Sequence, residues 1–243
     1  MATPHQSKHR VGLLIPSSNT NIEPEYYAVM PPSVSVHFGR LEMTEVSAAG
    51  LSGLEDDVTR QSELLATAGV DAILFCLTAA SFQLGLDYDA GLKQRIETAS
   101  GKPAMTAAQT IVDALNSLQV QRIAMATPFV PAVNEVSRAF MTANGFEVLS
   151  IEGLGLTDNF SIAQTDYETV RDLVRRADHG DAEALVIPGG NMPCLQVAPE
   201  LELALNKPVV TTNQAGIWAL LRQLGGQERL TGMGQLLADH LES

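Results

Sequence analysis

The chain has 243 residues and a hydrophobic content of 45%, enough for one large core or two modest ones, and its aromatic content of 5% predicts packing mainly by aliphatic side chains. Its net charge of −13 argues against nucleic acid and anionic membrane surfaces as partners, although local N–H donors can still bind a small anionic substrate. No apolar run is long enough to span a bilayer, and residues 1–10 contain no signal-peptide core, so we expect a soluble cytoplasmic protein.

The first half of the chain is predicted to alternate strands with helices. Cap-forming residues at 16–20 precede the first helix, and acidic residues at 55–57 fall in the first turn of the second. The expected strands are 11–15, 33–39, a third that ends at Cys76, and 103–106. The expected helices are 23–30, 54–68, 90–98 and 108–118.

The second half follows the same alternation. Its expected strands are 122–126, 146–151, 184–187 and 208–211, and its expected helices are 131–144, 167–177, 199–205 and 215–224. Strands that alternate with helices form βαβ units, and βαβ units build parallel sheets. The sequence therefore predicts an α/β fold.

Two segments of the chain repeat each other. Residues 102–109 read Lys-Pro-Ala-Met-Thr-Ala-Ala-Gln, residues 207–214 read Lys-Pro-Val-Val-Thr-Thr-Asn-Gln, and an Ala-Leu pair follows each at the same distance. Chance similarity between two strand-to-helix junctions is the alternative, but the matching positions favour a duplication. We predict two similar Rossmann-like lobes with parallel sheets, at 1–110 and 111–212, related by a pseudo-twofold axis with the active site between them. The C-terminal helix within 213–243 is expected to pack back on the first lobe.

Cys76 stands at the carboxyl end of the third predicted strand. The stretch 69–81 runs from a turn into a short unbroken apolar segment, typical of a parallel strand covered on both faces, and continues into small and hydroxylated residues. Ligands of open α/β sheets bind outside such strand ends, and the N-terminus of the following helix stabilises a thiolate. Cys76 is therefore a candidate nucleophile or base; the alternative is a small buried hydrophobic residue. Two cysteines make no disulfide framework, so both are expected as reduced thiols.

The chain resembles the aspartate/glutamate racemase superfamily over nearly its whole length, and within it the maleate cis-trans isomerases and arylmalonate decarboxylases. Five segments carry the resemblance: Pro16-Ser17-Ser18-Asn19-Thr20, Cys76-Leu77-Thr78-Ala79, Ala124-Met125-Ala126-Thr127-Pro128-Phe129, Asp158-Asn159 and Lys207-Pro208-Val209-Val210. The first two together are fairly specific for the isomerase branch. The resemblance implies an enzyme that acts on a small carboxylate without a cofactor and that forms a homo-oligomer.

The resemblance also assigns roles to single residues. Cys76 falls on the cysteine that adds to the substrate double bond in the isomerases, and Asn19 and Asn159 fall on asparagines that bind substrate carboxylates. Phe129 stands where a tyrosine is usual, so a hydroxyl that would contact the substrate is absent. Gly189 takes the usual place of the second cysteine.

Cys194 follows Gly189 by five residues, and two roles are open for it. If its loop folds inward, the Cys194 thiol serves as a proton donor or acceptor opposite Cys76. If the loop folds outward, Cys194 packs in the interior and one thiol remains for chemistry.

The predicted substrate contacts come from loops that follow strands. The residues are Ser17, Ser18, Asn19, Thr78, Phe129, Asn159, Gly189 and Gly190. The N–H groups after Ser17 and Thr78, with the two asparagine amides, are suited to stabilise negative charge on a carboxylate. For each loop a structural alternative is open: helix capping at 17–20, a turn at Asn159, and a tight turn at the two glycines.

Other sequence features indicate no further site. The five histidines are scattered without ligand spacing, so we expect no metal site. The glycine-containing segments lack the spacing of a phosphate or dinucleotide fingerprint, so we expect no nucleotide and no other cofactor.

Three functions follow from these observations. The leading hypothesis is a cofactor-independent cis-trans isomerase of a small unsaturated dicarboxylate, of the maleate-to-fumarate type, that acts through addition of the Cys76 thiolate. The second is a racemase or decarboxylase of a small carboxylic acid on the same scaffold. The third is a carboxylate-binding protein without catalysis. This hypothesis stays open because Phe129 and Gly189 replace the tyrosine and the second cysteine that are usual at these positions.

Overall fold

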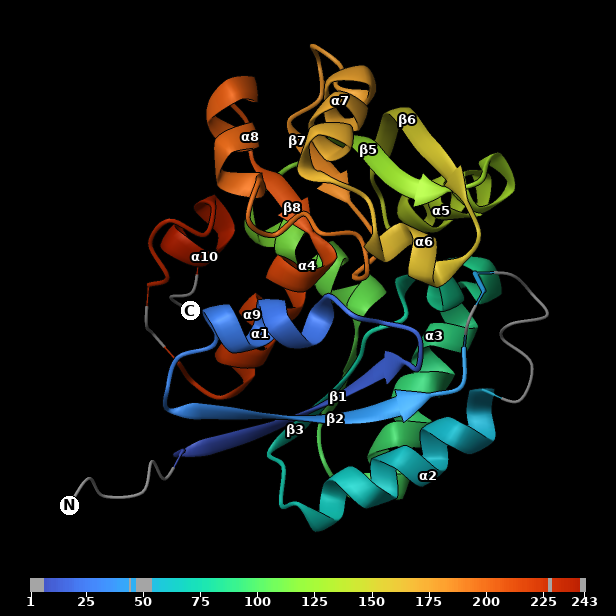
Figure 1. Cartoon of the computed structure of the whole chain (residues 1–243), viewed down its shortest axis with the longest axis vertical. Coiled ribbons are helices and arrows are strands. Elements are labelled where there is room, and N and C mark those ends of the chain that lie inside the picture. The colour runs from blue at the N-terminus through green and yellow to red at the C-terminus, as the bar shows by residue number, and fades with distance from the viewer. Residues whose placement is uncertain (1–6, 44, 47–53, 227–228, 241–243) are drawn as a thin grey trace.

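The computed structural model describes residues 7–43, 45–46, 54–226 and 229–240, and it contains two four-stranded parallel sheets (Figure 1). The first sheet has the strand order β2-β1-β3-β4 and the second β6-β5-β7-β8. The strands are β1 (His9–Pro16), β2 (Val34–Leu41), β3 (Ala72–Phe75), β4 (Ala104–Thr106), β5 (Arg122–Phe129), β6 (Glu147–Leu156), β7 (Ala184–Ile187) and β8 (Val209–Thr211). This arrangement confirms the predicted α/β fold.

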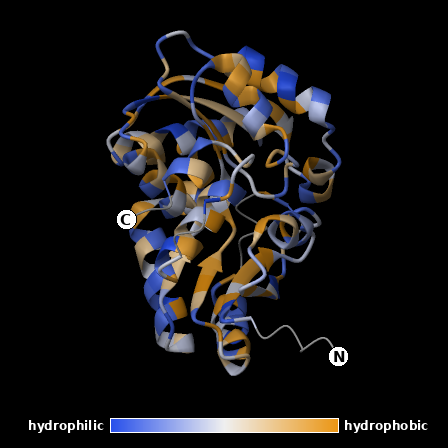
Figure 2. Cartoon of the chain, turned by 90° about the vertical axis from the view of Figure 1, so that its left-hand side faces the viewer, coloured by the Kyte–Doolittle hydropathy of each residue, from blue (hydrophilic) through white to orange (hydrophobic). Residues whose placement is uncertain are grey.

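Helices cover both faces of the sheets. They are α1 (Ile22–Val29), α2 (Leu54–Thr67), α3 (Thr78–Ser100), α4 (Ala107–Ser117), α5 (Pro131–Ala143), α6 (Asn159–Ala163), α7 (Tyr167–Ala177), α8 (Ala198–Leu205), α9 (Thr212–Gln223) and α10 (Gln235–Asp239). In Figure 1, α2 lies below the first sheet and α1 lies above it. The central strands β3 and β7 are buried at every residue, as expected for strands with helices on both faces. Figure 2 shows apolar strands in the interior and helices with mixed hydrophilic and hydrophobic faces around them.

Hydrogen bonds at the start of each sheet repeat between the lobes. In the first lobe the Arg10 N–H donates to Asp71 Oδ2 at 2.9 Å, and the Asp71 N–H donates to Arg10 O at 2.7 Å. In the second lobe the Arg122 N–H donates to Glu183 Oε2 at 3.0 Å, and the Glu183 N–H donates to Arg122 O at 2.8 Å. The similarity between residues 102–109 and 207–214 is thus accompanied by similar contacts outside those segments.

The strand ends that lie at the candidate site also correspond between the two lobes. Phe75 pairs with Thr106 at the end of β3, and Ile187 pairs with Thr211 at the end of β7. Helices α4 and α9 begin directly after β4 and β8 and pack against each other between the two sheets (Figure 1). Helix α4 also contacts β8, and α9 also contacts β3 and α1 of the first lobe. The predicted lobe boundary at residue 110 falls inside α4.

Three helical segments differ from the sequence-based expectation. Helix α3, expected only over 90–98, begins at Thr78; the helix continues on both sides of Gly85, whose own backbone is non-helical with φ 85°. The short helices α6 and α10 were not predicted, since five residues are too few for a periodic apolar pattern. The early start of α3 matters most, because it puts the first helical turn immediately after Cys76 and Leu77.

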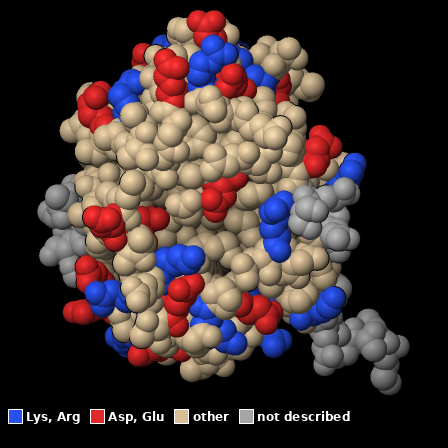
Figure 3. Space-filling model, turned by 180° about the vertical axis from the view of Figure 1, so that it is seen from behind, with Lys and Arg blue, Asp and Glu red and all other residues tan. Residues whose placement is uncertain are grey.

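Most apolar side chains gather in the interior, and most charged side chains lie on the surface. One cluster of buried apolar side chains runs through both lobes. On the face seen in Figure 3, acidic and basic side chains are interspersed and form no extended patch of one sign. In the part of the chain that the structure describes, no helix combines the length and apolar character needed to cross a membrane.

Candidate active site

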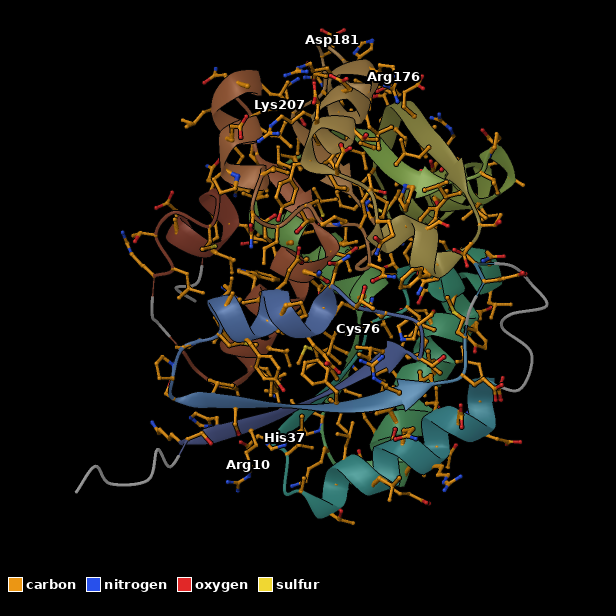
Figure 4. The ribbon with its side chains drawn as sticks, viewed as in Figure 1. Arg10, His37, Cys76, Arg176, Asp181 and Lys207 are labelled. Atoms are coloured by element: carbon orange, nitrogen blue, oxygen red, sulfur yellow. The ribbon has the colours of Figure 1, made fainter. Side chains whose placement is uncertain are left out.

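A small cavity lies where the carboxyl ends of β1, β3, β5 and β7 meet. Both lobes line it, as the predicted position between the lobes requires. The lining residues are Pro16, Asn19, Met43, Val46, Cys76, Leu77, Thr78, Ala79, Pro128, Phe129, Asn159, Ile162, Gly189, Gly190 and Asn191. Figure 4 shows Cys76 near the middle of the molecule, beside α1 and the strand ends.

Cys76 is fixed at this position by the sheet. Its N–H donates to Leu14 O at 2.8 Å, one step beyond the last pair of β1 and β3, and its Sγ lies 3.6 Å from Leu74 O. Burial raises the pKa of the Cys76 thiol well above its usual range. Loss of water therefore opposes the stabilisation expected from the start of α3 and favours the protonated thiol.

The first turn of α3 supplies backbone donors to the cavity. The N–H groups of Thr78 and Ala79 belong to the helix start, where no intrahelical acceptor is available. The Thr78 hydroxyl lies 3.3 Å from the Thr212 hydroxyl, which also accepts the Gly189 N–H at 2.9 Å. Thr212 thus joins the cavity wall of the first lobe to that of the second, a role that the sequence analysis did not identify.

Asn19 combines helix capping with a place in the cavity wall. Its Oδ1 accepts the N–H groups of Asn21 at 3.1 Å and Ile22 at 2.9 Å, at the start of α1. These bonds fix the orientation of the amide, so Nδ2 is the group left to donate within the cavity. The capping alternative for this loop is therefore observed, and substrate binding by Asn19 stays a prediction.

Ser17 and Ser18 lie behind the cavity and do not line it. Ser18 Oγ donates to Met43 O at 2.6 Å and accepts from Asn159 Nδ2 at 2.8 Å, and Ser17 Oγ accepts the Met43 N–H at 3.1 Å. Both hydroxyls hold the Met43 segment and Asn159 in place. Substrate contact by these two serines stays a prediction.

Asn191 links three loops of the cavity and was missed by the sequence analysis. Its Oδ1 accepts the Thr20 N–H at 3.0 Å, its Nδ2 donates to Asn159 O at 2.7 Å, and its own carbonyl accepts from Asn21 Nδ2 at 2.6 Å. Its position next to Gly189 and Gly190 in the loop after β7 was the available signal. The side chain holds loops of both lobes around the cavity.

Gly189 and Phe129 close the wall where the resemblance places a second cysteine and a tyrosine. Gly189 has φ +105°, and a Cβ at this position would lie 3.0 Å from Pro128 Cγ and 3.4 Å from Phe129 Cζ. Phe129 is almost fully buried and presents no hydroxyl. This part of the wall is apolar, and its backbone conformation favours glycine.

Cys194 is buried and does not line the cavity. Burial, reinforced by the charge of Glu25, raises the pKa of the Cys194 thiol well above its usual range, while Thr211 opposes the shift through a hydrogen bond. These surroundings agree with the packing alternative for Cys194, and its predicted catalytic role has no support from the cavity lining.

Glu25 interacts electrostatically with Cys194 and was not identified by the sequence analysis. Burial raises the pKa of Glu25 to about 7, against hydrogen bonds from Asn213 and from the backbone of Leu195 and Cys194 that favour its ionised form. The part of the chain with described coordinates contains no group of three or more His, Cys, Asp or Glu residues arranged to hold a metal ion.

Comparison with known proteins identifies the family of the chain. The family "Arylmalonate decarboxylase" matches residues 11–237. The chain is 27% identical to the maleate isomerase of Pseudomonas putida over 243 residues, which covers 95% of this chain and 97% of that protein. It is also 27% identical to the arylmalonate decarboxylase of Bordetella bronchiseptica over 229 residues, 93% of this chain and 95% of that protein.

A solved structure extends the comparison to three dimensions. The Nocardia farcinica maleate cis-trans isomerase, in a mutant with a covalently bound succinylcysteine intermediate, superposes with a TM-score of 0.91 at 27% identity. The match covers 97% of this chain and 99% of that one. The resemblance inferred from the sequence is thereby confirmed. The chain belongs to the arylmalonate decarboxylase family, and the proteins similar to it include maleate isomerases.

Proposed function

We propose that the protein is a cofactor-independent cis-trans isomerase of a small unsaturated dicarboxylate, of the maleate-to-fumarate type. The observation that carries this proposal is the Cys76 thiol in a cavity with donors from both lobes: the Asn19 amide, the N–H groups that begin α3, and the loop after β7. A similar protein, the Nocardia farcinica isomerase, forms a succinylcysteine intermediate, which is the species that addition of a thiol to maleate would give.

The reaction needs only one thiol. The S–H bond of Cys76 breaks and the sulfur bonds to one olefinic carbon, while the π electron pair shifts toward the other carbon and its carboxylate, which take up the proton. The former double bond is then a single bond and rotates. Elimination breaks the C–S bond and restores the double bond in the trans geometry, and sulfur recovers the proton that it gave up. No atoms are gained or lost, and no cofactor takes part.

The donors around the cavity act on the charge that develops during addition. The carboxylate that receives the electron pair needs N–H groups already in place, because a buried anion without donors is strongly destabilised. Asn19 Nδ2 and the N–H groups of Thr78 and Ala79 surround Cys76 from the first lobe. Gly190 and Asn191 offer backbone N–H groups from the second lobe.

A direct test is incubation of the protein with maleate while fumarate is followed by proton NMR. Fumarate formation that disappears in Cys76→Ala supports the proposal. Maleate that remains unchanged after long incubation with a high concentration of the protein contradicts it.

The raised pKa of the Cys76 thiol favours a second candidate, a racemase or decarboxylase. A thiol that is protonated at neutral pH can deliver its proton to a carbanion next to a carboxylate. Incorporation of solvent deuterium into amino acids or 2-aryl acids distinguishes this chemistry from isomerisation. A protein that binds maleate but gives neither product is the carboxylate-binding homologue.

A further inference from the structure

Glu25 joins the first lobe to the back of the cavity wall in the second. It lies on α1 and is buried, and it does not line the cavity. Its carboxylate accepts a hydrogen bond from Asn213 Nδ2 at the start of α9, and the backbone N–H groups of Leu195 and Cys194 also favour its ionised form. Three donors from the second half of the chain thus converge on one buried acceptor of the first.

Asn213 transmits this contact to the cavity. The same Nδ2 that donates to Glu25 also donates to Gly190 O at 3.0 Å. The other side of Gly190 has no free space, since a Cβ there would lie 2.7 Å from Asn213 Oδ1 and 3.0 Å from Ile22 Cδ1. Gly190 lines the cavity, so its position depends on the amide that Glu25 holds.

We propose that Glu25 is a positioning residue: its carboxylate fixes Asn213, and through Asn213 the backbone of Gly190 and Asn191, in the geometry that receives a substrate carboxylate. The part that concerns the substrate rests on the function proposed above. Glu25 itself touches no substrate, because the loop after β7 separates it from the cavity.

The proposed contact depends on the charge of Glu25. An ionised carboxylate is an acceptor only and suits three converging N–H donors, whereas a protonated one places an O–H among them. The titratable groups that face Glu25 are Cys194, in the loop after β7, and Tyr26, its neighbour on α1, both with pKa values raised by burial. Among the described residues, no cation contributes to the pKa of Glu25, and burial brings that pKa to about 7. Glu25 therefore holds Asn213, and through Asn213 the Gly190 backbone, more firmly as pH rises through neutrality.

The test is an NMR titration of the backbone amides of the full-length chain between about pH 5.5 and 8.5, which brackets the pKa of Glu25. In the unmodified protein the Gly190 and Asn191 resonances should shift with a midpoint near that pKa, about 7. Glu25→Gln should abolish this titration. Asp89→Asn is the matched control, because Asp89 is another buried carboxylate with a raised pKa that does not line this cavity, and it should leave the titration intact.

Asn213→Ala tests the link itself. Glu25 remains in this variant, but the bond to Gly190 is lost, so the Gly190 shift should shrink while the Leu195 amide continues to titrate. This variant also decides the question if Glu25→Gln does not fold. Resonances of Gly190 and Asn191 that do not respond to pH in the unmodified protein, or that titrate unchanged in Glu25→Gln, would overturn the proposal.

Kinetics separate this inference from the proposed function. With maleate as substrate, Glu25→Gln should raise KM at least about tenfold at about pH 8, with a smaller change in kcat, and the difference should narrow at about pH 6. The NMR titration requires no turnover. A protein that titrates as expected but leaves maleate unchanged therefore contradicts the isomerase proposal alone.

Discussion

The backbone position of Cys76 places its thiol at the cavity and at the same time buries it, which disfavours the thiolate. The sheet fixes the backbone of Cys76, and the burial that this requires raises the pKa of its thiol. A substrate carboxylate held by nearby donors does not remove this burial. In the addition step proposed above, the thiol therefore loses its proton as the C–S bond forms, and we expect slow alkylation and oxidation of Cys76 at neutral pH.

We predict that Cys76→Ala abolishes turnover and changes the melting temperature by only a few degrees, because a methyl group replaces a small side chain.

Iodoacetamide should label Cys76 faster than Cys194, since, of the two cysteines, only Cys76 lines the cavity. The labelling rate should increase about tenfold per pH unit from about pH 7 to 9, because the raised pKa leaves thiolate as the minor form throughout. Mass spectrometry of Cys194→Ser and Cys76→Ala isolates each thiol. Faster labelling of Cys194 would contradict the prediction.

A second thiol is not expected to be restored by Gly189→Cys. The φ of +105° and the close approach of Pro128 oppose any side chain there, so Gly189→Cys and Gly189→Ala should each cost about 1–3 kcal/mol of unfolding free energy. Gly91→Ala is the matched control, because Gly91 lies within α3 with open space at its Cβ, and it should be neutral or stabilising. Calorimetry measures all three. A stable Gly189→Cys protein with faster turnover would show that the wall adapts to a thiol.

Single residues of the site differ in how well the sequence predicts them. Cys76, Asn19 and Asn159 follow strands or precede helices, so local pattern and family resemblance were sufficient to find them. Glu25 and Asn191 act through contacts to residues about 170–190 positions away, such as Asn213 and Thr20. No local periodicity records such a contact, and it becomes visible only when the lobes are assembled.

Matching helix starts offer a comparison at the level of elements. Thr106 caps α4 by accepting the Gln109 N–H at 3.2 Å, and Thr211 caps α9 by accepting the Gln214 N–H at 3.1 Å. Thr106 Oγ1 also donates to the buried Asp89 carboxylate at 2.7 Å. The two helices repeat in sequence and structure, but the hydroxyl of one cap contacts a buried carboxyl group and the hydroxyl of the other contacts the buried Cys194 thiol.

We predict that Thr211→Ala lowers the free energy of unfolding by about 1–2 kcal/mol, as expected for loss of an N-cap. Thr106→Ala should cost more, because the Asp89 carboxyl group also loses its donor. Denaturant titrations measure both, and the corresponding serine variants, which keep the hydroxyl, should recover most of the loss. Equal costs for the two alanine variants would mean that the Asp89 contact contributes nothing.

The strands and most helices were predictable because their signals are local. The burial of every residue in β3 and β7 matches their unbroken apolar runs, and Thr106 and Thr211 mark helix starts in the sequence. The first half of α3 was not predicted, because Gly85 interrupts the helical backbone and hides the pattern. That missed turn supplies the N–H donors beside Cys76, so the error in the element obscured part of the site.

At the scale of the whole molecule, Glu25 couples stability to pH. Its pKa rises from 4.5 to about 7 on folding, so the folded state binds the proton more tightly than the unfolded state between these values. Stability therefore falls as pH rises through this window, by up to about 3 kcal/mol from this group. Glu25→Gln should flatten the pH dependence between about pH 5 and 8, measured by urea unfolding. A pH dependence unchanged in the variant would contradict the raised pKa.

Helices α4 and α9 pack on each other, and each also contacts a strand of the opposite sheet. Neither half of the chain can therefore complete its own core alone, and separately expressed halves should lack a cooperative melting transition but regain one when mixed.

The contact between α4 and α9 also has a consequence for each half on its own. A separate half would expose the helix face that now meets its repeat, so we expect each half, expressed alone, to pair with an identical copy through this face. Of the two halves, only the first has a cysteine directly after its third strand.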